Sequence, residues 1–196
     1  FKKILSIIAK CSTKIYVQNI YDKKILSNFV SDKKLSLLNG SGIDVNFYAN
    51  KINNKETLYD FTYIGRIIKD KGINEFIDAA ININKIFPNI KFCIQGEHYT
   101  QRKDRIINLK KFEKAIKNNI IIYLEYGNVI DTINNSKWLI LPSYREGSSK
   151  ILQEAISMGK PCLASDVPGC NNIVLDKFNG FLFKPNSSKE IEKIIV

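Results

Sequence analysis

The apolar positions of the chain follow two alternating patterns. Short, nearly continuous apolar runs, typical of strands covered on both faces, occur at residues 14–18, 35–39, 58–65, 90–96, 120–125, 138–143 and 161–165. Apolar residues at helical spacing predict helices at 73–86, about 102–118, 129–133, and from 151 to a stop at Gly159. This alternation predicts an α/β fold: a Rossmann-like open parallel sheet with helices on both faces.

Both ends of the chain are less regular. Residues 1–44 read as helix, strand, helix and strand, leading into "NGSGID", and the polar "NKINNKET" follows at 50–57. The last residues, "NSSKEIEKIIV", predict a helix cut off after two turns, and the chain begins with Phe. We therefore expect a piece of a longer protein: residues 1–44 as the tail of a preceding domain with its linker, and 45–196 as a domain truncated at its C-terminal end.

The net charge and the cysteines indicate which binding partners and which cellular location to expect. The formal net charge is +11, but the lysines are scattered and no arginine-aromatic patch marks a base-stacking surface, so we expect no nucleic-acid partner. Attraction to an anionic membrane surface fits better, since each nearby Lys or Arg adds about 1 kcal/mol. No apolar run approaches the roughly 20 residues of a membrane span. Four cysteines without C-x-x-C spacing favour a reduced, cytoplasmic location. Together with the positive charge, this leads us to expect a protein that is peripheral on the inner face of a membrane.

Two basic residues follow the third predicted strand. In "YIGRIIKDKG" (63–72), Gly65 ends the strand, Arg66 and Lys71 flank a loop, and Gly72 opens a helix. Ligands of such sheets collect at the carboxyl ends of strands, and a helix start offers free N–H groups. The loop is therefore suited to a diphosphate; a solvated basic turn is the other interpretation.

A second loop, "LPSYREGSSKILQEA" (141–155), also runs from strand to helix. Its small residues 147–149 leave the first-turn amides open to a phosphate, and Lys150 adds a cation. Glu146 would face the same crevice, and Glu154, eight positions later, could hold a ribose diol. Taken singly, Glu146 could instead favour the helix dipole and Glu154 could be a surface charge.

A third loop, "ASDVPGCNNIV" (164–174), follows the last predicted strand. Gly169 would let the backbone approach a ligand, although a plain turn built by Asp166, Pro168 and Gly169 explains the stretch equally well. The single histidine, His98, is expected to be a loop residue.

The order of these stretches resembles the donor-binding half of glycosyltransferase family 4. "GR…KDKG", "PSYREG…QEA", "G-K-P-x-x-A-S-D-V-P-G" and "NGFLF" occur in that family's order, and "NGSGIDVNFY" (39–48) is similar to its interdomain stretch. Members are retaining enzymes with two facing Rossmann-like domains, the GT-B arrangement. The resemblance implies that residues 45–196 form the C-terminal nucleotide-sugar (donor) domain and that 1–44 end the acceptor domain.

The resemblance also implies a role for each matching residue. Glu146 would sit by the donor sugar, and Glu154 would hold the ribose. Arg66 and Lys71 would neutralise the departing diphosphate, so Glu146, Arg66 and Lys71 form the expected catalytic group. Further donor contacts would come from Gly65, Val129, Ser148, Ser149 and Lys150, with the base near the backbone of Val129 and the diphosphate at the amides of 148–150.

The reaction implied is transfer of a sugar from a UDP-sugar to a glycan or lipid-linked acceptor, in polysaccharide or lipopolysaccharide assembly. No D-x-D or clustered His/Asp/Glu site appears, so we predict no metal and no cofactor, with cations in the metal's place. Acceptor-domain residues have no counterpart, so we expect donor binding without turnover by the 196 residues alone. Two alternatives stay open: a non-catalytic nucleotide-sugar-binding module, or another enzyme on a similar sheet, such as a dinucleotide-dependent oxidoreductase, for which no G-x-G-x-x-G follows a strand.

Overall fold

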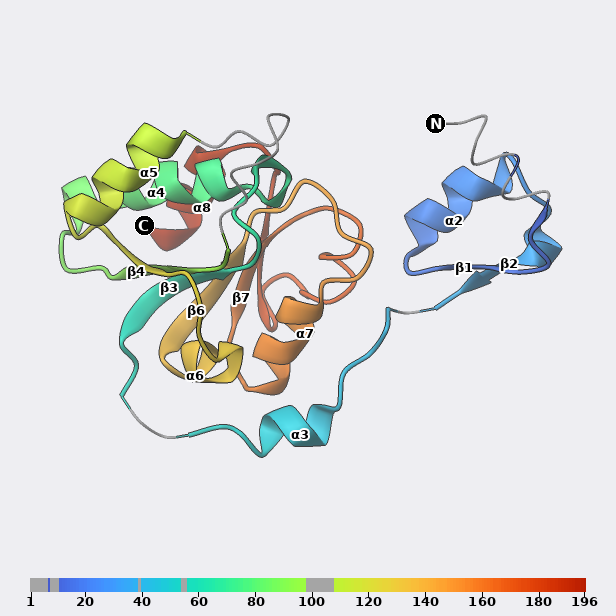
Figure 1. Cartoon of the computed structure of the whole chain (residues 1–196), viewed down its shortest axis with the longest axis horizontal. Coiled ribbons are helices and arrows are strands. Elements are labelled where there is room, and N and C mark those ends of the chain that lie inside the picture. The colour runs from blue at the N-terminus through green and yellow to red at the C-terminus, as the bar shows by residue number, and fades with distance from the viewer. Residues whose placement is uncertain (1–6, 8–10, 39, 54–55, 98–107) are drawn as a thin grey trace.

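The body of the protein is a six-stranded parallel sheet with helices on both faces (Figure 1). The computed structural model describes residues 7, 11–38, 40–53, 56–97 and 108–196. Across the sheet the strands follow the order β5-β4-β3-β6-β7-β8. Their bounds are β3 (Tyr59–Ile64), β4 (Phe92–Gln95), β5 (Ile121–Leu124), β6 (Ser136–Leu141), β7 (Cys162–Ser165) and β8 (Gly180–Phe183). The predicted fold class is confirmed.

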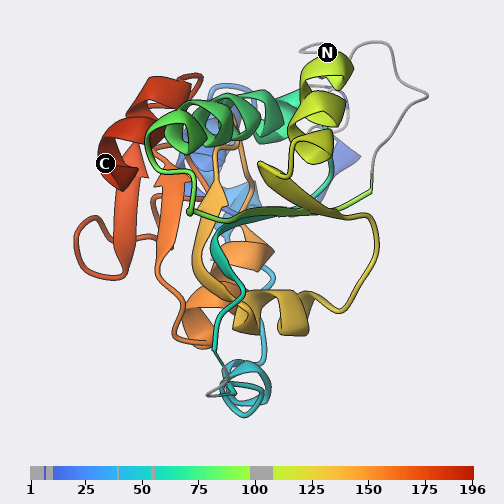
Figure 2. The ribbon, with the colours of Figure 1, turned by 90° about the vertical axis from the view of Figure 1, so that its left-hand side faces the viewer.

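The helices form two layers that Figures 1 and 2 show from perpendicular directions. One face of the sheet carries α4 (Ile73–Ile86), α5 (Leu109–Lys117) and α8 (Ser188–Ile195). The other carries α6 (Val129–Asn134) and α7 (Lys150–Ser157). The central strand β3 is covered on both sides, which explains its apolar sequence, and Tyr63 within it is fully buried.

Helix α4 shows how the sequence pattern becomes packing. It begins and ends where the spacing predicted, and Ile73, Phe76, Ile77 and Ala80 are buried against the sheet. Helix α7 likewise ends before Gly159, whose φ of 72° is the left-handed conformation expected at a helix end.

One strand and one α-helix of the described residues were not predicted. Strand β8 is the "NGFLF" segment, which is short and begins with glycine; it becomes a strand by pairing with β7 at the sheet edge. The five-residue helix α3 (Val45–Ala49) lies within the stretch interpreted as an interdomain connection. Of the helix predicted at 102–118, residues 109–117 are helical, while 102–107, like His98, lie outside the described residues.

The N-terminal segment forms a small unit of its own. Strands β1 (Ile15–Val17) and β2 (Leu35–Leu37) pair in parallel, with α2 (Ile20–Ser27) and the short 3-10 helix η1 (Asp32–Lys34) between them. This is the strand–helix–strand order expected there; the first predicted helix falls mostly outside the described residues. The domain boundary at residue 44 stays a prediction. No helix in the described ranges is both long and apolar enough to cross a bilayer.

Candidate functional site

The direction in which the chain adds strands to the sheet reverses between β3 and β6. From β3 the chain proceeds to β4 and β5 on one side, and from β6 to β7 and β8 on the other. In open α/β sheets, ligands bind outside the carboxyl ends of the strands at such a switch point. The loops after these two strands, residues 65–72 and 142–149, therefore meet where a ligand is expected.

All nine residues to which the family resemblance assigns a role line one cavity at this point. The cavity has a volume of about 420 Å³. Its predicted members are Gly65, Arg66, Lys71, Val129, Glu146, Ser148, Ser149, Lys150 and Glu154, and Ile64, Leu141 and Ile151 complete the lining. Residues from three separate stretches of sequence thus share one space, which their order along the chain could not show.

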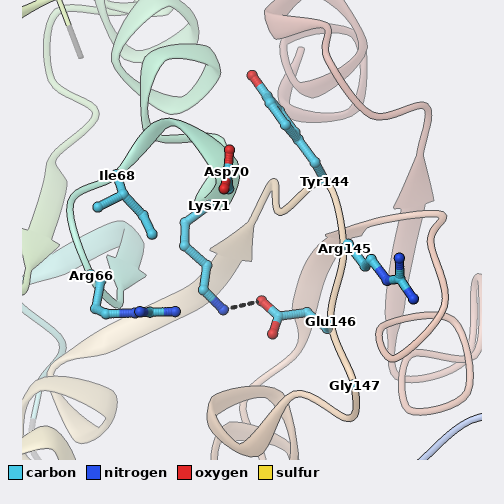
Figure 3. A pocket seen from close by; sticks show the side chains of 8 residues that line it. All are labelled: Arg66, Ile68, Asp70, Lys71, Tyr144, Arg145, Glu146 and Gly147. Atoms are coloured by element: carbon cyan, nitrogen blue, oxygen red, sulfur yellow. Dashed lines mark hydrogen bonds and ion pairs between the residues drawn. The ribbon is translucent and has the colours of Figure 1, made fainter. Parts of the chain in front are cut away.

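Lys71 and Glu146 form an ion pair in this cavity. Lys71 ends the short 3-10 helix η2 (Lys69–Lys71), and its Nζ lies 2.5 Å from Glu146 Oε1 in the loop after β6. Figure 3 shows this contact, with the Arg66 side chain extending into the same space. Only 20% of the Lys71 side chain and 12% of the Glu146 side chain are exposed. Glu146 is therefore held by a cation, which argues against a role limited to the helix dipole.

Glu154 is buried rather than a surface charge. Only 7% of the residue is exposed, although it lies on a helix. Its Oε1 accepts a 2.6 Å hydrogen bond from the hydroxyl of Tyr48 and lies 3.5 Å from Lys150 Nζ. Tyr48 was not among the predicted site residues; it lies on helix α3, which was not predicted.

The start of α7 differs from the expectation at one amide. Ser149 is the N-cap residue and its side chain makes no capping hydrogen bond. Its N–H, however, donates to the carbonyl of Gly169 at 2.9 Å, so this amide already has a partner within the protein. Lys150 and Ile151, the first two helical residues, have amides without intrahelical acceptors.

The third loop supports the site instead of lining it. Pro168 O accepts the Glu146 N–H at 3.3 Å, and Gly169 O accepts the Ser149 N–H. A Cβ on Gly169 would lie 2.8 Å from the Cβ of Glu146. The backbone approach expected of Gly169 is therefore made to the Glu146 loop.

The N-terminal unit also holds this loop. The side chain of Asn19, 6% exposed, donates from Nδ2 to Gly147 O at 3.0 Å. Asp22 pairs with Arg145, and Gln18 Oε1 occupies the space that a Cβ on Gly147 would fill. The loop with Glu146 is thus fixed from two sides, by residues 168–169 and by the start of α2.

A second cavity of about 390 Å³ adjoins the first. The two share Arg66, Lys71 and Glu146, so the ion pair faces both. The second is drawn in Figure 3 and includes Tyr144, whose hydroxyl donates to Glu75 Oε1 at 2.8 Å. Within the described ranges, no three His, Cys, Asp or Glu side chains are grouped to hold a metal ion.

Comparison with known families identifies the class of protein. Residues 44–195 match the family model described as "Glycosyl transferases group 1". The chain belongs to this family. Membership confirms the glycosyltransferase class and decides against an oxidoreductase on a similar sheet.

Two bacterial glycosyltransferases are among the curated relatives of this chain. The chain is 30% identical over 196 residues to an Escherichia coli UDP-Gal:alpha-D-GlcNAc-diphosphoundecaprenol alpha-1,3-galactosyltransferase, covering 91% of the chain and 49% of that protein. It is 26% identical to the capsular polysaccharide biosynthesis glycosyltransferase CapM of Staphylococcus aureus, covering 94% and 53%. The chain thus spans about half the length of the curated relatives it matches.

Solved structures show the same fold. Anabaena Alr3699/HepE, crystallised in complex with UDP and glucose, superposes with a TM-score of 0.82 at 18% sequence identity, covering 99% of this chain and 55% of that one. Sucrose-phosphate synthase from Thermosynechococcus elongatus superposes with a TM-score of 0.78 at 18% identity, covering 100% and 52%. At these identities the likeness concerns the fold alone.

Proposed function

We propose that this chain is the donor-binding part of a retaining glycosyltransferase that transfers a sugar from a UDP-sugar to a glycan or lipid-linked saccharide. One observation carries the proposal: all predicted donor residues line a single cavity at the β3–β6 switch point. The relatives add support, because the E. coli protein is named for a UDP-Gal donor and a diphosphoundecaprenol acceptor. The HepE structures contain UDP or UDP-glucose.

In this proposal the diphosphate of the donor lies among positive groups. Arg66, Lys71 and Lys150 surround the cavity, and the first amides of α7 open into the same region. When the bond between the sugar C1 and the diphosphate breaks, its electron pair stays on the phosphate oxygen. Fixed cations and amides stabilise that charge without reorganising, which is a major term in enzyme catalysis.

The acceptor completes the transfer. Its hydroxyl oxygen bonds to C1 on the face that the diphosphate leaves, and its proton passes to the departing phosphate oxygen, so configuration is retained. Glu146, held by Lys71 beside both cavities, would accept hydrogen bonds from donor-sugar hydroxyls. Glu154 would bind the ribose and the backbone near Val129 the base.

We further propose that transfer needs neither a metal ion nor a cofactor. The cavity contains three cationic side chains, Arg66, Lys71 and Lys150, and its two carboxylates, Glu146 and Glu154, each have a cation beside them. The lysine beside each carboxylate opposes a divalent ion by charge repulsion, whereas sugar hydroxyls can still donate hydrogen bonds to these oxygens. We also propose that the protein lies on the cytoplasmic side of a membrane and is held there by its basic surface. A second domain of the same protein would bind the acceptor and complete the active site.

Calorimetric titration of the chain with UDP and UDP-sugars tests the proposal. We expect binding that is unchanged by EDTA and weakened about 10-fold or more in Lys71→Ala and Glu154→Ala, because each removes a hydrogen bond involving a charged group. Lys137→Ala is the control, since Lys137 is exposed near the opposite end of β6. Unchanged affinity in both site variants would refute the site. Robust sugar transfer by the chain alone would refute the need for a second, acceptor-binding domain.

A further inference from the structure

Tyr48 joins the segment before the sheet to the candidate donor site. It lies on α3, whose N-cap Asp44 accepts a hydrogen bond from the Phe47 N–H at 2.9 Å. The Tyr48 ring packs against the hydrophobic core and stands edge-on to Phe47, with centroids 5.2 Å apart. From this position its hydroxyl reaches Glu154, 106 residues later in the sequence, at 2.6 Å.

The hydrogen bond occupies one side of the Glu154 carboxylate. Tyr48 Oη donates to Oε1, and Lys150 Nζ lies 3.5 Å from the same oxygen. The hydrogen bond from Tyr48 and the contact with Lys150 both involve Oε1, Oε2 is not among the buried side-chain oxygens of the described residues that lack a partner, and Glu154 lines the cavity. One oxygen is therefore held by the protein, while the other keeps its acceptor capacity for a ligand.

The tyrosine is the proton donor in this contact. The hydrogen bond to Glu154, together with burial, raises the pKa of Tyr48 to about 12. The phenol therefore keeps its proton at neutral pH, and the Glu154 carboxylate accepts.

We propose that Tyr48 is a positioning residue that makes the donor site selective for ribose. By fixing Oε1 it directs Oε2 to the cavity, where Oε2 accepts hydrogen bonds from the 2′- and 3′-hydroxyls of the nucleotide. A carboxylate fixed before binding loses less conformational freedom when the diol arrives. Without the tyrosine, Glu154 is free to turn toward Lys150. This inference rests on the proposed function.

The test compares UDP with 2′,3′-dideoxy-UDP, which lacks the diol but keeps the base and the diphosphate. Calorimetry of the unaltered chain should show UDP binding at least 10-fold tighter than the dideoxy analogue, because the analogue cannot make the proposed hydrogen bonds to the Glu154 carboxylate. Tyr48→Phe keeps the ring and removes the hydroxyl. It should weaken UDP binding about 10-fold and leave dideoxy-UDP binding within about twofold.

Two further variants isolate the effect. Tyr59→Phe removes a hydroxyl from a partly buried tyrosine at the opposite end of β3, and both affinities should stay unchanged. In a Glu154→Ala background, Tyr48→Phe should have no additional effect on UDP binding, because the carboxylate it positions is gone.

The outcomes separate the two proposals. If the unaltered chain prefers UDP and Tyr48→Phe keeps that preference, the positioning role is wrong while the donor site stands. Equal loss of both ligands would show a structural role, and tighter UDP binding would show that Tyr48 obstructs the ribose; either overturns the inference. If the unaltered chain does not bind UDP, the proposed function itself fails.

Discussion

Lys71 and Glu146 hold opposite charges in contact at the place where an anionic ligand is expected. Their side chains are 2.5 Å apart, come from loops after different strands, and are both mostly buried. Removing one member of such a pair leaves the other poorly compensated. Lys71 should therefore attract an incoming diphosphate and Glu146 should repel it. Substituting each residue in turn distinguishes these two effects.

Lys71→Met should weaken UDP binding about 10- to 100-fold, because it removes a charge-assisted hydrogen bond and leaves Glu146 facing the diphosphate. Glu146→Gln should leave UDP binding equal or tighter, since it frees Lys71 and removes a negative charge. Both affinities can be measured by calorimetry.

Lys193→Met is a matched control for this pair. Lys193 Nζ contacts Glu190 Oε1 at 2.6 Å on α8, at the exposed surface. Such a pair contributes little, and UDP affinity should not change. Weakened UDP binding in Glu146→Gln would contradict the assigned roles.

Gly72 should be far less tolerant of substitution than Gly159. The two have φ angles of 70° and 72°, but a Cβ on Gly72 would overlap the carbonyl of Pro142, whereas Gly159 has open space. Left-handed backbone alone costs a residue with a Cβ about 1 to 2 kcal/mol. We expect Gly159→Ala to lower the free energy of unfolding by about 1 kcal/mol and Gly72→Ala by about 3 kcal/mol or more, because steric overlap is added. Chemical denaturation measures both, and equal losses would contradict the close approach of the β3 and β6 loops.

Asn19 should affect both stability and binding, because it caps α2 and also holds the Glu146 loop. Its Oδ1 accepts the Asp22 N–H at 2.8 Å while its Nδ2 donates to Gly147 O. Asn19→Ala should cost about 2 kcal/mol of unfolding free energy and weaken UDP binding several-fold, since a cap and a loop contact are lost together.

Asn108 provides the comparison for Asn19, because its side chain caps α5 by accepting the Lys111 N–H at 3.2 Å. Asn108→Ala should cost about 1 kcal/mol and leave UDP binding unchanged. If Asn19→Ala also leaves UDP binding unchanged in calorimetry, the loop does not depend on this contact.

Stability should fall in alkaline solution because of buried thiols. Burial raises the pKa of Cys93 and of Cys170 from 9.0 to about 12. At a pH between the thiol pKa of the unfolded chain and that of the folded chain, the unfolded chain releases thiol protons that the folded chain retains. The free energy of unfolding therefore decreases as pH rises from about 9 toward 12. Denaturation with a reductant present, over pH 8 to 11, measures the slope.

The exposed thiol of Cys11 supplies the control for that slope. Cys11→Ser should keep the alkaline loss of stability, and Cys93→Ala should reduce it. An unchanged slope in Cys93→Ala would show that the buried thiol does not contribute.

The local chemistry of the chain was readable from its sequence. Periodicity predicted β3, α4 and α7 nearly to the residue, because their apolar positions repeat over enough length to identify the buried face. β8 and α3 were not recognised, because elements of four and five residues carry too little pattern. The residue types at 65–71 and 146–154 suggested a site for an anion and a sugar. This was readable because glycines, cationic residues and the start of a helix are neighbours along the chain.

What the sequence could not decide is which of these groups touch. Lys71 and Glu146 meet because parallel pairing brings the ends of β3 and β6 together, and Tyr48 reaches Glu154 because α3 packs on α7. The amide of Ser149 is taken by Gly169 because two loops pack together, which no local pattern records. Local propensity and periodicity act over a few neighbouring residues, whereas these contacts join positions 20 to more than 100 residues apart; the sequence by itself therefore determined the elements and their chemistry, and only the tertiary structure determined the pairs.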